Sequence, residues 1–86
     1  MKEVNNRQKN KLNKKLAADR LREARINAGY PSANHASISL GWSVKIYFQH
    51  EEGLKSFDLH TAKKYGKAFK VSSDYLHPFE DDNDVI

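Results

Sequence analysis

The sequence predicts a small all-α protein of one domain. Apolar residues recur three and four positions apart in several stretches, which is the period of a helix with one buried face. No stretch alternates apolar and polar residues as a half-buried strand would. The chain has 86 residues, 38% of them apolar, which suffices for one compact core. An architecture of short packed helices suits this length best.

The first helix is expected to follow a basic arm. Residues 5–15 are polar and basic around a single apolar residue, Leu12, and asparagine is a poor helix former. We therefore expect a flexible basic arm over residues 1–14. A helix is expected over residues 16–28, with Gly29 ending it. Four apolar residues spaced by four, three and four positions share one face of this helix: Ala17, Leu21, Ala24 and Ala28.

A proline and a serine separate this helix from the next one. Pro31 disfavours a helical backbone at the residue before it. Ser32 can cap a helix by accepting hydrogen bonds from its free N–H groups, so we expect a second helix over residues 33–40. Three residues of this helix are expected to face inwards: Ala36, Ser37 and Leu40.

A tight turn then leads into a third helix, expected over residues 44–52. Gly41 can adopt the positive φ of a sharp helix exit, and Ser43 can cap the helix that follows. Tyr47 is expected to face inwards. Two short helices joined in this way, over residues 32–53, have the shape of a helix-turn-helix.

Two further helices complete the predicted fold. Asp58 can cap a fourth helix, and Ser72 or Ser73 can cap a last short turn over residues 74–77. Five residues of the fourth helix keep the helical period: Leu59, Ala62, Tyr65, Gly66 and Phe69.

Charge is unevenly distributed along the sequence. The net charge is +4, but residues 1–25 hold nine Lys/Arg against three Asp/Glu, whereas an acidic tail over residues 79–86 holds no base. The tail has four carboxylates: Glu80, Asp81, Asp82 and Asp84. A basic excess attracts polyanions and supplies the salt-sensitive part of nucleic-acid affinity. An ordinary solvated surface, however, has the same composition.

Several classes of protein are disfavoured by what the sequence lacks. It has no cysteine, no apolar run long enough for a membrane span and no signal peptide, so we expect a cytoplasmic protein. It has no glycine-rich phosphate loop, and its four histidines lack the paired spacing of a metal or catalytic site. These histidines are His35, His50, His60 and His77. We therefore expect no catalytic activity, no bound metal and no cofactor.

Three segments match the pattern of one family in order and spacing. They are Leu21-Arg22-x-x-Arg25-x-x-x-Gly29-Tyr30, then Gly41-Trp42-Ser43 with Tyr47…His50-Glu51-x-Gly53, and last Tyr65-x-x-x-Phe69-x-Val71-Ser72-x-x-Tyr75-Leu76. Over residues 20–76 the chain therefore resembles the Cro-and-repressor family of helix-turn-helix proteins, also called XRE or λ-repressor-like. The resemblance implies a five-helix λ-repressor-like domain over residues 15–78. It also implies a sequence-specific DNA-binding transcriptional regulator, with repression as the first expectation.

The resemblance further implies which residues meet DNA. The third helix is expected to enter the major groove, where Lys45 can donate to guanine and Gln49 can bond adenine in two places. Val44 and Phe48 can lie against thymine methyl groups. Four residues are expected to contact phosphates: Ser32, Asn34, Ser43 and Lys55. Glu52 departs from the pattern, because the family often has a neutral phosphate-binding residue there.

In such proteins an Arg on the first helix and a Glu ending the third form a partly buried ion pair. The matching residues here are Arg25 and Glu51. An Arg fork can hold a carboxylate by two parallel hydrogen bonds, which would fix the third helix against the first. The alternative is two surface charges that never meet. Ser37 stands where a small apolar residue is common, and it is small enough to fit.

Double-stranded DNA is the expected partner, bound by a homodimer on two half-sites about 34 Å apart. The dimer contact is expected near the end of the fold, through Leu76, Phe79 and Tyr75. A second class of function stays open, in which the same fold binds a protein through Ile46, Phe48 and the acidic tail, or serves as the antitoxin of a toxin–antitoxin pair. Salt separates the two classes, because phosphate contacts weaken steeply with salt and apolar contacts do not.

Overall fold

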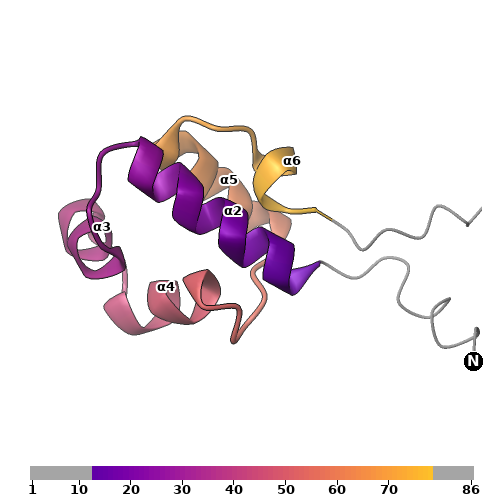
Figure 1. Ribbon diagram of the computed structural model, residues 1–86, viewed down its shortest axis with the longest axis horizontal. Coiled ribbons are helices and arrows are strands. Elements are labelled where there is room, and N and C mark those ends of the chain that lie inside the picture. Colours follow the sequence, from indigo (N-terminus) through magenta and orange to yellow (C-terminus); the bar gives the residue numbers. More distant parts are fainter. Residues whose placement is uncertain (1–12, 79–86) are drawn as a thin grey trace, which may run out of the picture.

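The computed structural model describes residues 13–78, and within them the chain forms five helices and no strand (Figure 1). The helices are α2 (Lys14–Asn27), α3 (Ala33–Leu40), α4 (Val44–Glu51), α5 (Leu59–Phe69) and α6 (Ser73–Leu76). The expected all-α class is confirmed. The expected acidic tail lies outside the described residues, as does the expected basic arm apart from Asn13 and Lys14.

Each helix begins after a polar residue that caps it. The side-chain oxygen of the cap accepts a hydrogen bond from the N–H three residues further on, at 2.8–3.2 Å. The five caps are Asn13, Ser32, Ser43, Asp58 and Ser72. The first helix was expected to begin at Leu16, but it begins at Lys14 because asparagine, a poor residue inside a helix, is a good cap.

The helices are short and depend on packing for their stability. The longest described helix, α2, has 14 residues, and α3 and α4 have eight each. Helices of this length are marginal in water unless they bury an apolar face. No helix within residues 13–78 is long and apolar enough to cross a membrane.

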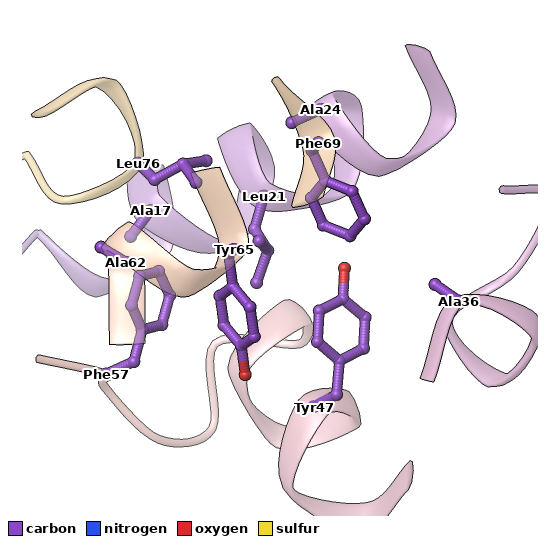
Figure 2. Packing of buried hydrophobic residues seen from close by; sticks show 10 residues of the cluster. All are labelled: Ala17, Leu21, Ala24, Ala36, Tyr47, Phe57, Ala62, Tyr65, Phe69 and Leu76. Carbon is purple, nitrogen blue, oxygen red and sulfur yellow. The ribbon is translucent and has the colours of Figure 1, made fainter. Parts of the chain in front are cut away.

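The core combines alanines and Leu21 of α2 with aromatic rings from α4, from α5 and from the loop between them (Figure 2). Ala17 and Ala24 of α2 leave room for the rings of Tyr47, Tyr65 and Phe69. The fully or nearly fully buried apolar cluster consists of Ala17, Leu21, Ala24, Ala36, Tyr47, Phe57, Ala62, Tyr65, Phe69 and Leu76. Helix α2 packs against all four other helices, so it forms the centre of the described domain.

The two ends of the described chain lie side by side. The N–H of Asn13 donates a hydrogen bond to the carbonyl of Pro78 at 2.7 Å, and Figure 1 shows the chain entering and leaving the domain at the same end. This bond ties the start of α2 to the segment after α6.

Two residues that the helical period predicts to face inwards are exposed. Ala28 lies one residue beyond the end of α2, where the chain has already left the helical face. Leu59 is the first residue of α5 and is 43% exposed, because the helix reaches the core only from Ala62 onwards. In both cases the apolar spacing in the sequence extends beyond the part of the helix that packs against another helix.

Candidate functional site

The connection between α3 and α4 is a turn of three residues. Gly41 has φ 75° and ψ 28°, the left-handed conformation that glycine adopts without strain. The N–H of Trp42 then donates to the carbonyl of Ser37 at 2.8 Å, and Ser43 caps α4. The turn therefore directs α4 away from α3 with its backbone groups paired.

Trp42 anchors this turn to the core. Its ring centroid lies 4.8 Å from that of Tyr65, 5.5 Å from that of Tyr47 and 5.7 Å from that of Phe69. Aromatic pairs at these separations stabilise each other beyond the area that they bury. The half-buried Trp42 thus holds the first turn of α4 in place.

An ion pair fixes the last turn of α4. The Arg25 Nε donates to Glu51 Oε2 at 2.8 Å, and Arg25 Nη2 donates to Glu51 Oε1 at 3.0 Å. The third guanidinium nitrogen, Nη1, donates to the carbonyl of Tyr30 at 2.8 Å. Both charged side chains are buried, and the hydrogen bonds to Glu51 raise the pKa of Arg25. The structure thus brings together the two residues for which the resemblance implies an ion pair.

Ser37 is accommodated at the contact between α3 and α4. It is fully buried, and its hydroxyl donates to the carbonyl of Ala33 at 2.8 Å. A buried hydroxyl costs little when it has such a partner.

The inner face of α4 carries two polar groups with different surroundings. The Nδ1 of His50 lies 2.8 Å from the hydroxyl of Tyr65, and burial lowers the pKa of His50, with the charge of Lys64 as the next cause. The hydroxyl of Tyr47 is buried and has no hydrogen-bond partner among the described residues. Burial raises the pKa of Tyr47, and the nearby Glu51 carboxylate adds to this.

The outer face of α4 is open. Lys45 and Gln49 lie two positions before and after Tyr47, so the helical period directs them away from the core. Val44 and Phe48 are 40% and 47% exposed on one flank of this face. The four residues expected to contact bases therefore form one patch, in which Gln49 is half-buried and the others are exposed.

The residues expected to contact phosphates lie at the ends of α3 and α4. All four are exposed: Ser32 and Asn34 at the start of α3, Ser43 before α4 and Lys55 after it. The hydroxyls of Ser32 and Ser43 accept from the N–H groups of His35 and Ile46, which leaves each hydroxyl hydrogen free to donate.

The charge near α4 is almost balanced. Lys45 and Lys55 are exposed, but so is Glu52, which follows Lys45 and Gln49 on the outward row of the helix. Glu51 is neutralised by Arg25. Positive charge alone thus does not distinguish this face.

The exposure of two isoleucines near α4 extends the apolar surface. Ile38 of α3 is 66% exposed and Ile46 of α4 is 52% exposed. The exposure of Ile38 was not predicted, although the period of α3 contains the signal. Ala36, Ser37 and Leu40 face inwards, which leaves position 38 on the opposite side.

Of the residues expected at a dimer contact, Leu76 is unavailable. It is fully buried in the core of its own chain, beside Ala17 and Ala62 (Figure 2). Tyr75 is partly covered by the guanidinium of Arg20, which lies 4.6 Å from its ring centroid and donates to its carbonyl at 2.9 Å. Phe79 lies outside the described residues.

Comparison with known proteins finds no matching family model, no matching curated protein and no matching solved structure. Within residues 13–78, no group of three His, Asp or Glu side chains could hold a metal ion.

Proposed function

We propose that this protein is a sequence-specific DNA-binding regulator with a λ-repressor-like helix-turn-helix fold, in which α3 and α4 form the motif and α4 enters the major groove. Repression is the mode of action that we expect first, because occupancy of a site by a small domain suffices for it. The protein would act in the cytoplasm, as a homodimer on two half-sites about 34 Å apart.

The observation that carries this proposal is the contrast between the two faces of α4. The inner face is held at both ends, by Trp42 at the start and by the Arg25–Glu51 pair at the end. The outer face presents a patch with no partner in the fold. A groove about 12 Å wide admits a helix, and a helix held rigidly on its scaffold positions its side chains against base edges.

The chemistry of the patch suits base recognition. Lys45 would donate to guanine and Gln49 would bond the N6 and N7 atoms of adenine. Val44 and Phe48 would lie against thymine methyl groups. The free hydroxyl hydrogens of the caps, the N–H groups at the start of α3, and the side chains of Asn34 and Lys55 would contact phosphates on either side.

A second candidate function is protein binding, and the apolar exposure around α4 favours it. Three apolar side chains of α4 and one of α3 are exposed near each other in sequence: Ile38, Val44, Ile46 and Phe48. Large apolar side chains left exposed are the groups through which a helix can bind a protein partner. The antitoxin of a toxin–antitoxin pair would combine both functions.

Selection from a random pool of DNA duplexes tests the proposal. The wild-type chain should enrich a common sequence, and its affinity should fall steeply between about 50 and 200 mM salt. The double variant Lys45→Ala/Gln49→Ala should lose the sequence preference, whereas Lys15→Gln, which removes an exposed lysine of α2, should keep it. The absence of any enriched sequence and of any duplex retardation at low salt would refute the proposal in favour of protein binding.

A further inference from the structure

Helix α5 carries positive charge with no carboxylate on the same helix. Helix α5 and its C-terminal cap hold four lysines and no Asp or Glu: Lys63, Lys64, Lys67 and Lys70. The other residues within 13–78 hold seven Lys/Arg against six Asp/Glu. Outside α5 and its cap the described residues therefore sum to a net charge of only +1, although α2 holds five Lys/Arg against two Asp/Glu.

Three of these lysines form a row that points away from α4. Lys63 and Lys67 are four positions apart on the side of α5 opposite to Tyr65, and Lys70 follows three positions later as the C-terminal cap of the helix. The ring of Tyr65 faces Tyr47 of α4 across the core, at 5.3 Å between centroids. The outer faces of the two helices therefore point to opposite sides of the domain, with α4 along its lower edge and α5 above it in Figure 1. We call Lys63, Lys67 and Lys70 the lysine row.

The lysine row lacks the partners that would make it a neutral surface. All three side chains are exposed, and none of the ion pairs within residues 13–78 includes one of them. Like charges four positions apart on a helix repel each other. The helix dipole favours Lys67 and Lys70 near the C-terminal end of α5, but not Lys63 in its middle.

The backbone at Lys70 adds a second, independent cost. Its φ is 61° and its ψ is 45°, the left-handed conformation in which helices commonly end on glycine. Within residues 13–78 it is the only residue other than glycine with a positive φ. A lysine at this position keeps a cation at the end of the row at the expense of backbone strain.

We propose that the lysine row binds a phosphodiester backbone and is a nucleic-acid surface separate from α4. The row spans seven residues of helix, or about 10 Å. About three phosphates of one strand of a duplex occupy the same length, one for each lysine. The surface contacts backbone only and reads no sequence.

The composition of the row favours nucleic acid over an acidic protein. Lysine is depleted at the centre of protein interfaces, which rely on aromatic and apolar anchors. Nucleic-acid interfaces are much more positively charged than protein interfaces, and flexible lysines suit phosphates as point charges. The row has no apolar residue between its lysines on the outward face of α5.

Two nucleic-acid surfaces on opposite sides would let one domain hold two duplex segments at once. That α4 holds one of the two duplex segments rests on the proposed function. That the lysine row binds the other segment does not. Binding to α5 can therefore be measured whether or not α4 reads DNA.

A capture assay with two duplexes tests the proposal. One duplex is immobilised and loaded with protein, and a second labelled duplex of unrelated sequence is added at about 50 mM salt. The wild-type chain should retain the second duplex. Lys63→Gln/Lys67→Gln/Lys70→Gln should lose this capture, and the charge-preserving variant Lys63→Arg/Lys67→Arg/Lys70→Arg should keep it. Circular dichroism of both variants checks that the helices are intact.

The salt dependence of binding to the unrelated duplex gives a second readout. The slope of log affinity against log salt should become shallower by about 2.7 in the Gln variant, since each phosphate contact contributes about 0.9. The proposal would be overturned if the Gln variant still captured the second duplex and its binding had the same salt slope as that of the wild-type chain. It would equally be overturned if DNA binding stayed unchanged while NMR signals of residues 80–84 shifted, because the row would then hold the acidic tail.

The assay separates this inference from the proposed function. In Lys45→Ala/Gln49→Ala the lysine row is intact, so that variant should still bind the unrelated duplex with the salt slope of the row. If the wild-type chain enriched no sequence while the Gln variant still showed the shallower slope, the proposed role of α4 would be removed and the role of α5 would remain.

Discussion

The side chain of Glu51 fixes the position of α4 against α2. Its two carboxylate oxygens take two hydrogen bonds from one guanidinium, and that guanidinium also holds the carbonyl of Tyr30 at the end of α2. A single ion pair therefore connects the end of α4 to α2 and to the chain leaving α2. Buried ion pairs of this kind add little net stability. A buried charge whose partner has been removed, however, strongly destabilises the fold.

Removing one partner of the pair should reveal that cost. Glu51→Gln should lower the free energy of unfolding in urea by about 3 kcal/mol, because the buried guanidinium of Arg25 loses its counter-charge. The double variant Arg25→Met/Glu51→Leu should lose less than Glu51→Gln alone. If Glu51→Gln lowered the free energy of unfolding by less than about 0.5 kcal/mol, the guanidinium of Arg25 would have to be solvated.

Removing the hydroxyl group from two buried tyrosines should change the stability of the fold in opposite directions. Tyr47→Phe removes a buried hydroxyl without a partner and should stabilise the fold by about 1 kcal/mol, whereas Tyr65→Phe breaks the hydrogen bond to His50 and should destabilise it by about 1 kcal/mol. Both changes keep the ring and its packing. Urea denaturation of the two variants checks the signs, and a destabilised Tyr47→Phe would contradict the absence of a partner.

The stability of the fold should fall as the pH is lowered from about 7 to about 5, because of His50. Burial, and then the charge of Lys64, lowers the pKa of His50 below its ordinary 6.5; Lys55 acts in the same direction and Asp58 against it. Below the unfolded pKa the unfolded chain takes up a proton that the folded chain does not, and folding becomes less favourable. His50→Gln should flatten this part of the stability profile, and exposed His60→Gln should not. Equal profiles for both variants would exclude His50 as the cause.

At the scale of the element, α5 combines tight packing on one side with charge on the other. A Cβ added at Gly66 would lie 2.5 Å from the carbonyl of Val71, so the segment that connects α5 to α6 can approach α5 this closely only at a glycine. The side of the helix opposite to Tyr65 carries Lys63 and Lys67 of the lysine row. Lys70 belongs to the lysine row and also ends the helix, in a left-handed conformation that glycine adopts more easily than lysine.

The two left-handed helix ends offer a matched pair of substitutions. Lys70→Gly should stabilise the fold by about 0.5–1 kcal/mol, because glycine relieves the strain at positive φ but loses more entropy on folding. Gly41→Ala should destabilise it by about 1 kcal/mol, and only through backbone strain, since no atom lies within 4 Å of the added Cβ. Thermal unfolding of both variants is the measurement. The same sign for both would show that the two ends do not share this conformation.

For the whole molecule, the distribution of charge matters more than its sum. The face around α4 is nearly neutral, and the lysine row lies on the opposite side. Recognition by α4 would then depend on hydrogen bonds and apolar contacts, with little electrostatic attraction. Binding by the lysine row would depend almost wholly on charge and would be the first to disappear as salt rises.

Glu52 provides a test of this division. Under the proposed function, Glu52→Gln should tighten duplex binding by α4 about two- to fivefold at low salt, because it removes a carboxylate from the end of the outward row. Glu23→Gln makes the same charge change on the exposed side of α2 and should have a smaller effect. Fluorescence titration of a labelled duplex compares the two, and equal effects would mean that Glu52 does not face the DNA.

The helices and the outward patch of α4 were predictable because their signals are local. Ser32, Ser43 and Asp58 cap through a bond that reaches only three residues along the chain, so the sequence marks these helix starts directly. The outward direction of Lys45 and Gln49 follows from the helical period once Tyr47 is assigned to the core. Ala28 and Leu59 were predicted wrongly, because the period does not say where a helix runs out of neighbours.

The sequence alone determined the all-α class, the order of the helices and the starts of α3, α4 and α5, because these depend on residues within one turn of each other. The partner of His50, the unpaired hydroxyl of Tyr47 and the burial of Leu76 were decided only by tertiary structure, since each depends on residues that are distant along the chain. The same holds for the lysine row. Its spacing is visible in the sequence, but its position opposite α4 results from the packing of Tyr65 against Tyr47 across the core.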